Sequence, residues 1–137
     1  MAETPSTMVS LGTAAPAFRL PDPAGKFVSS DDFMSAPALL VAFICNHCPF
    51  VKHIRSQFAE FARDAQARGV AVVAINSNDV TTNPDDSRPS NGRPVTGKDL
   101  RAAIAAVLAG KPVSVEQKPS VGCNIKWKSR AATRYAH

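Results

Sequence analysis

The chain has 137 residues, of which 45% are hydrophobic and 20% are charged, the composition of an ordinary globular domain. This length suits a single domain that buries a sizeable core. No segment approaches the roughly 18 consecutive apolar residues that span a membrane, and residues 1–5 lack a basic or apolar leader. We therefore expect neither a membrane span nor a secretory signal.

The formal net charge of +5 is concentrated toward the end of the chain. After Glu116 there is no acidic residue and there are five basic ones, Lys118, Lys126, Lys128, Arg130 and Arg134. A basic end can contact nucleic acid, but little aromatic interleaving and no nucleic-acid motif accompany it. We therefore predict a solvated basic tail over residues 113–137 and no nucleic-acid partner.

The first predicted element is a β-hairpin. Residues 1–15 are small and polar, and we expect them to be flexible. Apolar residues at 17–20 and 26–28 flank the turn-rich cluster 21–25, which favours two antiparallel strands. The Ser and Asp side chains at 29–32 offer caps for a short turn around Phe33.

Residues 38–75 predict a βαβ unit. Strand-forming residues occupy 38–45, and apolar residues then recur at helical spacing over 49–68. Pro49 suits the first turn of that helix, and Gly69 suits its end. A second continuous apolar run follows at 70–75. Strand, helix and strand at this spacing predict a parallel pair that is buried on both faces.

A long polar stretch separates this unit from a second helix. Residues 76–95 have almost no apolar periodicity, and a loop of this length in a compact domain indicates a wrong assignment or missing elements. A clean helical pattern then begins at Thr96, the predicted N-cap, and ends at Gly110. Its apolar face carries Leu100, Ala103, Ile104, Val107 and Leu108.

Two cysteines lie where the first strand meets the first helix. Cys45 and Cys48 form a C-x-x-C motif, which at this junction indicates a dithiol redox site. The positive end of the helix favours a thiolate, the nucleophilic form of cysteine. His47, if protonated, would stabilise the thiolate further, and Lys52 would add positive potential about one turn on.

The alternative to redox chemistry for the same residues is a zinc half-site or two buried thiols. Zinc takes four ligands, and no second C-x-x-C exists, although His47, His53 and Cys123 could contribute. We therefore expect no metal. With three cysteines, two of them in one motif, we also expect no disulfide framework and a reducing, cytoplasmic location.

Several blocks of sequence together identify a family. The segments are 43–52 (FICNHCPFVK), 69–79 (GVAVVAINSND), 86–89 (DSRP), 94–101 (PVTGKDLR) and 117–128 (QKPSVGCNIKWK). In this order they resemble the AhpC/TSA-type redoxins, which are peroxiredoxin-like proteins with a thioredoxin fold. The resemblance covers about residues 10–128.

The chain departs from this family after Asp79. Family members carry a helix, further strands and a loop with a cis-proline facing the cysteines, and on that pattern roughly 50 residues are absent here. We therefore predict an α/β, incomplete thioredoxin-like fold over residues 16–112, with an irregular junction at 77–95. Losing half of the sheet leaves an open edge, so we expect marginal stability, aggregation or a homodimer.

The resemblance implies a thiol–disulfide oxidoreductase or a peroxiredoxin-like antioxidant without a bound cofactor. Its partners would be a peroxide or protein disulfide and a thiol reductant. We favour Cys45 as the nucleophile and Cys48 as the resolving thiol, although Cys48 followed by Pro49 also resembles a peroxidatic cysteine. Cys123 is a further candidate thiol. A non-catalytic remnant and a metal-binding or thiol-carrier module remain the alternatives.

Overall fold

The structure is a computed structural model of the chain, and it describes residues 3–45, 48–76, 96–119 and 121–123. Its elements in chain order are β1 (Glu3–Pro5), β2 (Arg19–Pro21), β3 (Phe27–Ser29), a short 3₁₀ helix η1 (Ser30–Phe33), β4 (Leu39–Phe43), α1 (Pro49–Ala67), β5 (Ala71–Ile75), α2 (Lys98–Leu108) and β6 (Val121–Cys123). The predicted junction at 77–95, and the deletion inferred there, lie outside the described residues.

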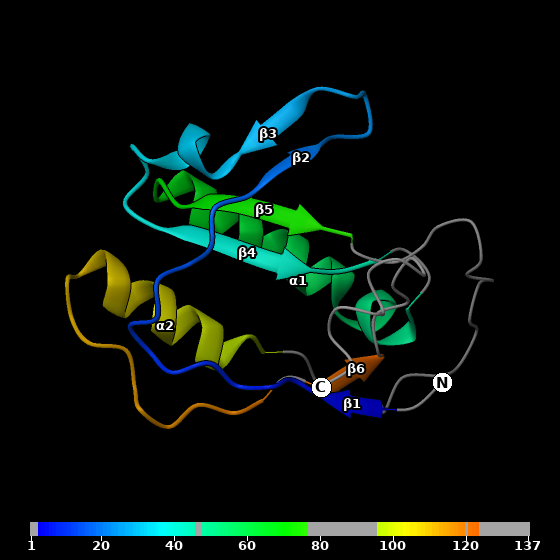
Figure 1. Cartoon of the computed structure of the whole chain (residues 1–137). Coiled ribbons are helices and arrows are strands. Elements are labelled where there is room, and N and C mark those ends of the chain that lie inside the picture. The colour runs from blue at the N-terminus through cyan, green and yellow to red at the C-terminus, as the bar shows by residue number, and fades with distance from the viewer. Residues whose placement is uncertain (1–2, 46–47, 77–95, 120, 124–137) are drawn as a thin grey trace.

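The predicted βαβ unit is confirmed at the centre of the fold. β4 and β5 pair in parallel, with Leu39 opposite Ala71 and Phe43 opposite Ile75. α1 connects them and lies behind the sheet in Figure 1. β4 ends at Phe43, two residues before the predicted end of the strand, and Ile44 still donates its N–H to the Ile75 carbonyl. Cys45 therefore lies beyond the strand.

The hydrophobic core lies between the two long helices and one face of this sheet. Phe61 and Ala65 of α1 are buried together with Ile104 of α2 and with Val70, which lies between α1 and β5. Partly buried side chains surround this cluster, namely Ala38, Leu40, Phe58, Val72, Leu100 and Leu108. The spacing of the buried positions on α1 is that of one helical face, which is why the sequence pattern located this helix correctly.

The prediction that the parallel strands are buried on both faces is wrong for the face of β4 that points away from the core. Side chains alternate along a strand, and Leu39, Val41 and Phe43 of β4 point away from the core. All three are exposed, Phe43 by 63%. In the described part of the chain no helix covers this face, so an apolar run that suits a central strand is left half solvated.

The second helix begins one residue later than the sequence indicated. Gly97, with φ at 63°, is the N-cap of α2, whereas Thr96 had been expected there. Glycine enters this left-handed conformation at little cost, so the chain turns into the helix at Gly97. The Oγ1 of Thr96 instead accepts the backbone N–H of Lys98 at 3.4 Å.

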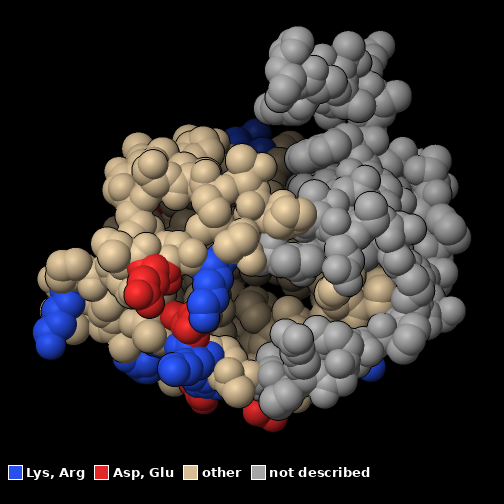
Figure 2. Space-filling view, turned by 90° about the horizontal axis from the view of Figure 1, so that it is seen from below, with Lys and Arg blue, Asp and Glu red and all other residues tan. Residues whose placement is uncertain are grey.

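Arg101 of α2 contacts two residues of α1 at the surface. Its guanidinium donates to Asp64 at 3.4 Å and lies 5.2 Å from the centre of the Phe61 ring. Both partners of the ion pair are well exposed, so the pair contributes about 0–1 kcal/mol. Figure 2, which views the molecule from below, shows basic and acidic side chains intermixed on this described surface.

The predicted hairpin is present as the antiparallel pair β2 and β3. Its turn is closed by Asp22, whose Oδ1 accepts the N–H groups of Ala24 and Lys26, each at 2.9 Å. Ser29 caps η1, as expected. Its hydroxyl oxygen accepts the N–H of Asp31, and the carboxylate of Asp32 accepts the N–H of Ser29.

Residues 3–5 and 121–123 form a short ribbon that the sequence did not predict. β1 pairs with β6 in antiparallel fashion, with Glu3 opposite Cys123. The sequence instead predicts a flexible segment over 1–15 and a basic tail over 113–137. Strands of three residues carry too little alternation to be recognised locally, and their pairing depends on backbone hydrogen bonds between distant segments.

Gly69 offers a first test of this fold. Replacing it with alanine should lower the free energy of unfolding by about 1–2 kcal/mol, because its φ of +87° is strained for any residue with a Cβ. The new methyl would lie 3.6 Å from Pro37, an ordinary contact, so backbone strain dominates. Urea unfolding measures the change.

The matched control is Gln66→Ala, an exposed position on the same helix end, which should change stability by less than about 0.5 kcal/mol. If Gly69→Ala unfolded at the same urea concentration as the parent chain, the left-handed turn after α1 would be contradicted.

Candidate functional site

Cys48 and Pro49 form the beginning of α1. Cys48 is the N-cap, in an extended conformation, and Pro49 is the first helical residue, as predicted. Proline suits this position because its fixed φ is helical and its missing N–H would have had no partner in the helix. The Cys48 carbonyl accepts the N–H of Lys52 at 2.9 Å. Cys48 therefore lies at the positive end of the helix, where negative charge is favoured.

Cys45 reaches the same region from the sheet. Ile44 is still attached to β5, since its N–H donates to the Ile75 carbonyl at 3.0 Å. Cys45 follows it directly and is partly exposed, whereas Cys48 is only 5% exposed. Both carry thiols in this structure. His47 lies outside the described residues, so its proposed support of a thiolate stays a prediction.

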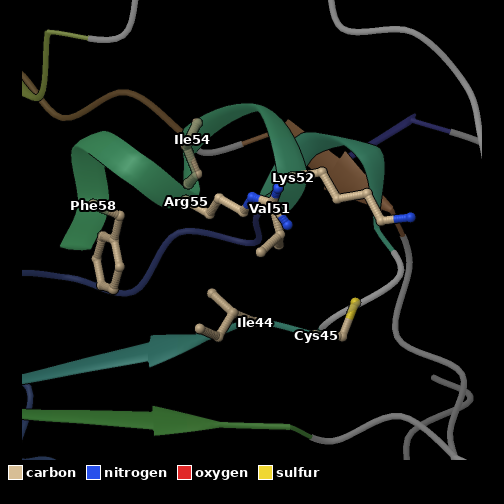
Figure 3. Close-up of a pocket in the computed structure, with 7 residues that line it drawn as sticks. All are labelled: Ile44, Cys45, Val51, Lys52, Ile54, Arg55 and Phe58. Carbon is tan, nitrogen blue, oxygen red and sulfur yellow. The ribbon is translucent and has the colours of Figure 1, made fainter.

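A pocket of about 180 Å³ opens beside Cys45. Figure 3 shows it between the end of β4 and the first turns of α1, with the Cys45 sulfur directed toward the helix. The lining residues are Ile44, Cys45, Val51, Lys52, Ile54, Arg55 and Phe58. The more exposed cysteine therefore has a cavity in front of it that can receive a reactant.

The charged part of the pocket is basic. Lys52, predicted to add positive potential, lines it, and Arg55 does so one turn further along α1. The first turn of α1 carries no acidic residue. Both residues belong to the first two turns of α1, so this end of the helix supplies the cationic side chains of the pocket lining. That they support a thiolate at Cys45 stays a prediction.

Arg55 is the site residue that the sequence analysis missed. A signal for it existed: Arg55 follows Lys52 by three residues, and residues at this spacing lie on one face of a helix. What the sequence lacked was the location of the pocket, which requires the end of β4 to be placed against that helical face.

Cys123 lies at the end of β6. In Figures 1 and 3 this strand lies beside the first turn of α1, so the fold brings the backbone of the third cysteine to the same end of the molecule as the motif. A role for its thiol stays a prediction.

Among the described residues, no group of three or more His, Cys, Asp and Glu side chains is arranged to hold a metal ion. No helix in this part of the chain is long and apolar enough to cross a membrane.

Known proteins resemble this chain in sequence and structure. The profile of the AhpC/TSA family matches residues 11–91. A hypothetical protein from Sinorhizobium meliloti 1021 has 39% identity and a TM-score of 0.84, over 92% of this chain and 99% of its own. An uncharacterized conserved protein from Geobacillus kaustophilus has 36% identity and a TM-score of 0.84, over 94% and 98%. A search of curated proteins gave no match. The similarity confirms the predicted fold class, an incomplete thioredoxin-like α/β fold.

Proposed function

Because the chain belongs to the AhpC/TSA family, we propose that it is a thiol–disulfide oxidoreductase or peroxiredoxin-like antioxidant that uses Cys45 and Cys48 as a reversible dithiol. Family membership supports a redoxin-like thiol peroxidase or oxidoreductase function in general. The observation that carries the finer proposal is the location of the two thiols, Cys45 on the wall of a pocket and Cys48 at the N-cap of α1.

Exposure supports a division of roles between the cysteines. Cys45 is partly exposed and faces the pocket, so its thiolate attacks the substrate. With a disulfide, a bond forms between the Cys45 sulfur and one substrate sulfur, and the other sulfur leaves as a thiolate. Cys48, which is almost fully buried, then attacks the Cys45 sulfur and expels the second thiolate. The product is a Cys45–Cys48 disulfide.

A peroxide enters the same cycle. The Cys45 thiolate attacks one peroxide oxygen, the O–O bond breaks, and the other oxygen leaves as hydroxide or alkoxide, which water protonates. Cys45 becomes a sulfenic acid. Cys48 condenses with it, releasing water and leaving the same disulfide. A thiol reductant restores the dithiol in either case, as a reducing compartment such as the cytoplasm provides.

The test is a redox titration of the purified chain across glutathione buffers. We expect a reversible two-electron couple in the parent chain, and its complete loss in both Cys45→Ser and Cys48→Ser. Cys123→Ser serves as the control that keeps the couple. Mass spectrometry after alkylation identifies the paired residues.

Three independent thiols, each titrating without regard to the others, would contradict the proposal and indicate a non-catalytic remnant. Stoichiometric zinc that stays bound through purification would favour the metal-binding alternative instead.

A further inference from the structure

We propose that the pocket beside Cys45 selects small organic disulfides that carry a carboxylate, with Lys52 and Arg55 as the residues that recognise the negative charge. This inference rests on the proposed function, since it names the class of substrate that the same thiol would meet.

The size and walls of the pocket point to an organic substrate. Its volume of about 180 Å³ is several times the share of one water molecule, about 30 Å³, so it holds far more than a hydrogen peroxide molecule. Four of its lining residues are apolar: Ile44, Val51, Ile54 and Phe58. A group with hydrocarbon or aromatic surface fits walls of this kind.

The charges of the pocket point to an anion. Among the described residues that line it, Lys52 and Arg55 are the charged ones, and none carries a carboxylate. Arg55 is exposed, and in the described part of the chain no ion pair engages it. A guanidinium presents a planar pair of donors that matches the two oxygens of a carboxylate. The N-terminal end of α1, where the helix dipole is positive, belongs to the same wall of the pocket.

The location of the thiol relative to these groups fixes where the disulfide would lie. In Figure 3, Cys45 enters the pocket from the sheet side, while Lys52 and Arg55 come from the helix side. A carboxylate held by the cations would present the neighbouring S–S bond to the Cys45 sulfur. The exchange then follows the two steps given above: one substrate thiolate leaves when Cys45 attacks, and the second leaves when Cys48 attacks Cys45.

The experiment compares two aromatic disulfides, dithiobis(nitrobenzoate), which carries two carboxylates, and dithiodipyridine, which is neutral. The second-order rate constant of each is measured with the parent chain and with Lys52→Gln, Arg55→Gln and the double variant. Arg63→Gln is the matched control, because it removes the same charge from an exposed position of α1 outside the pocket.

We expect each pocket variant to slow the anionic disulfide about fivefold, as loss of one close charge pair in water implies, and the double variant to slow it more than about tenfold. The neutral disulfide should change less than about twofold, and Arg63→Gln should change neither rate. Equal effects on both disulfides, or on neither, would overturn the proposed selectivity.

A second measurement needs no variant. Raising the salt concentration from about 0.01 M to about 1 M shortens the Debye length from about 30 Å to about 3 Å, so the anionic rate should fall while the neutral rate holds. A salt-independent anionic rate would overturn the inference.

The fate of the probe separates this inference from the proposed function. If the nitrobenzoate stays attached to Cys45 and no Cys45–Cys48 disulfide forms, the dithiol mechanism fails. The charge selectivity is judged from the first attack alone, so the ratio of the two rates still decides it.

Discussion

Replacing Phe61 with alanine should lower the free energy of unfolding by about 3–5 kcal/mol, the cost of removing a buried phenylalanine from a core. Phe61 is 5% exposed and belongs to the cluster that joins α1 to α2 and β5. Small domains have only about 5–15 kcal/mol in total, and the described core of this chain is small. The variant should therefore unfold at a clearly lower urea concentration than the parent chain, as circular dichroism during urea titration would show.

The control for this prediction is the same substitution at an exposed ring. Phe27 on β3 is 50% exposed, and the guanidinium of Arg19 lies 3.9 Å from its ring centre. Phe27→Ala should cost about 1 kcal/mol or less. A cooperative transition for Phe61→Ala at the parent midpoint would mean that the core lies elsewhere.

The second large effect concerns self-association. The parallel sheet of the described residues has two strands, so both of its outer edges are unpaired there, and Leu39, Val41 and Phe43 leave one face apolar and exposed. Such edges and faces bind other copies of a chain. We expect the parent chain to form dimers or larger species in a concentration-dependent manner.

Phe43→Lys should reverse this behaviour. Burying a phenylalanine contributes about 1.5–3 kcal/mol, so its loss should raise the Kd of self-association by about ten- to a hundredfold. Sedimentation equilibrium over a wide range of protein concentration measures the shift. The folding cost is small because the side chain is already 63% exposed.

Met34→Lys is the matched control for charge and lost apolar surface. Met34 is 81% exposed, is the C-cap of η1 and belongs to neither strand of the parallel pair, so its replacement should leave association unchanged. A parent chain that stays monomeric at every concentration, or equal responses to the two lysines, would contradict association through this face.

The elements that the sequence predicted well are those whose signals are local. The helical spacing of Phe58, Phe61 and Ala65, the proline at the start of α1 and the glycine after it each act within a few residues. The hairpin likewise depends on a turn that Asp22 closes by itself. These features therefore appear in the structure close to their predicted bounds.

The features that escaped prediction depend on distant parts of the chain. The apolar run of β4 is the same whether its second face is covered or open, so the sequence could not reveal that Val41 and Phe43 are exposed. Thr96 and Gly97 are both acceptable caps, and the direction in which the chain enters α2 decides between them.

In the candidate site, too, local features could be predicted and features that depend on packing could not. The C-x-x-C motif, Pro49 and Lys52 were recognisable as residues of one segment. The pocket, and with it Arg55, required the end of β4 to be placed against α1. The separation of the two thiols into a partly exposed and a buried one also depends on that packing.

The ribbon of β1 and β6 has a consequence for the order of folding. It joins the third residue of the chain to Cys123, whereas the two motif cysteines lie within the continuous unit from β4 to β5. Closing a longer loop costs more entropy, and segments that are near in sequence meet first. The dithiol is therefore assembled while the ends of the chain are still apart. On the proposed function, oxidation of Cys45 and Cys48 can then compete with the last step of folding, so the proposed disulfide can form before residues 3–5 and 121–123 pair.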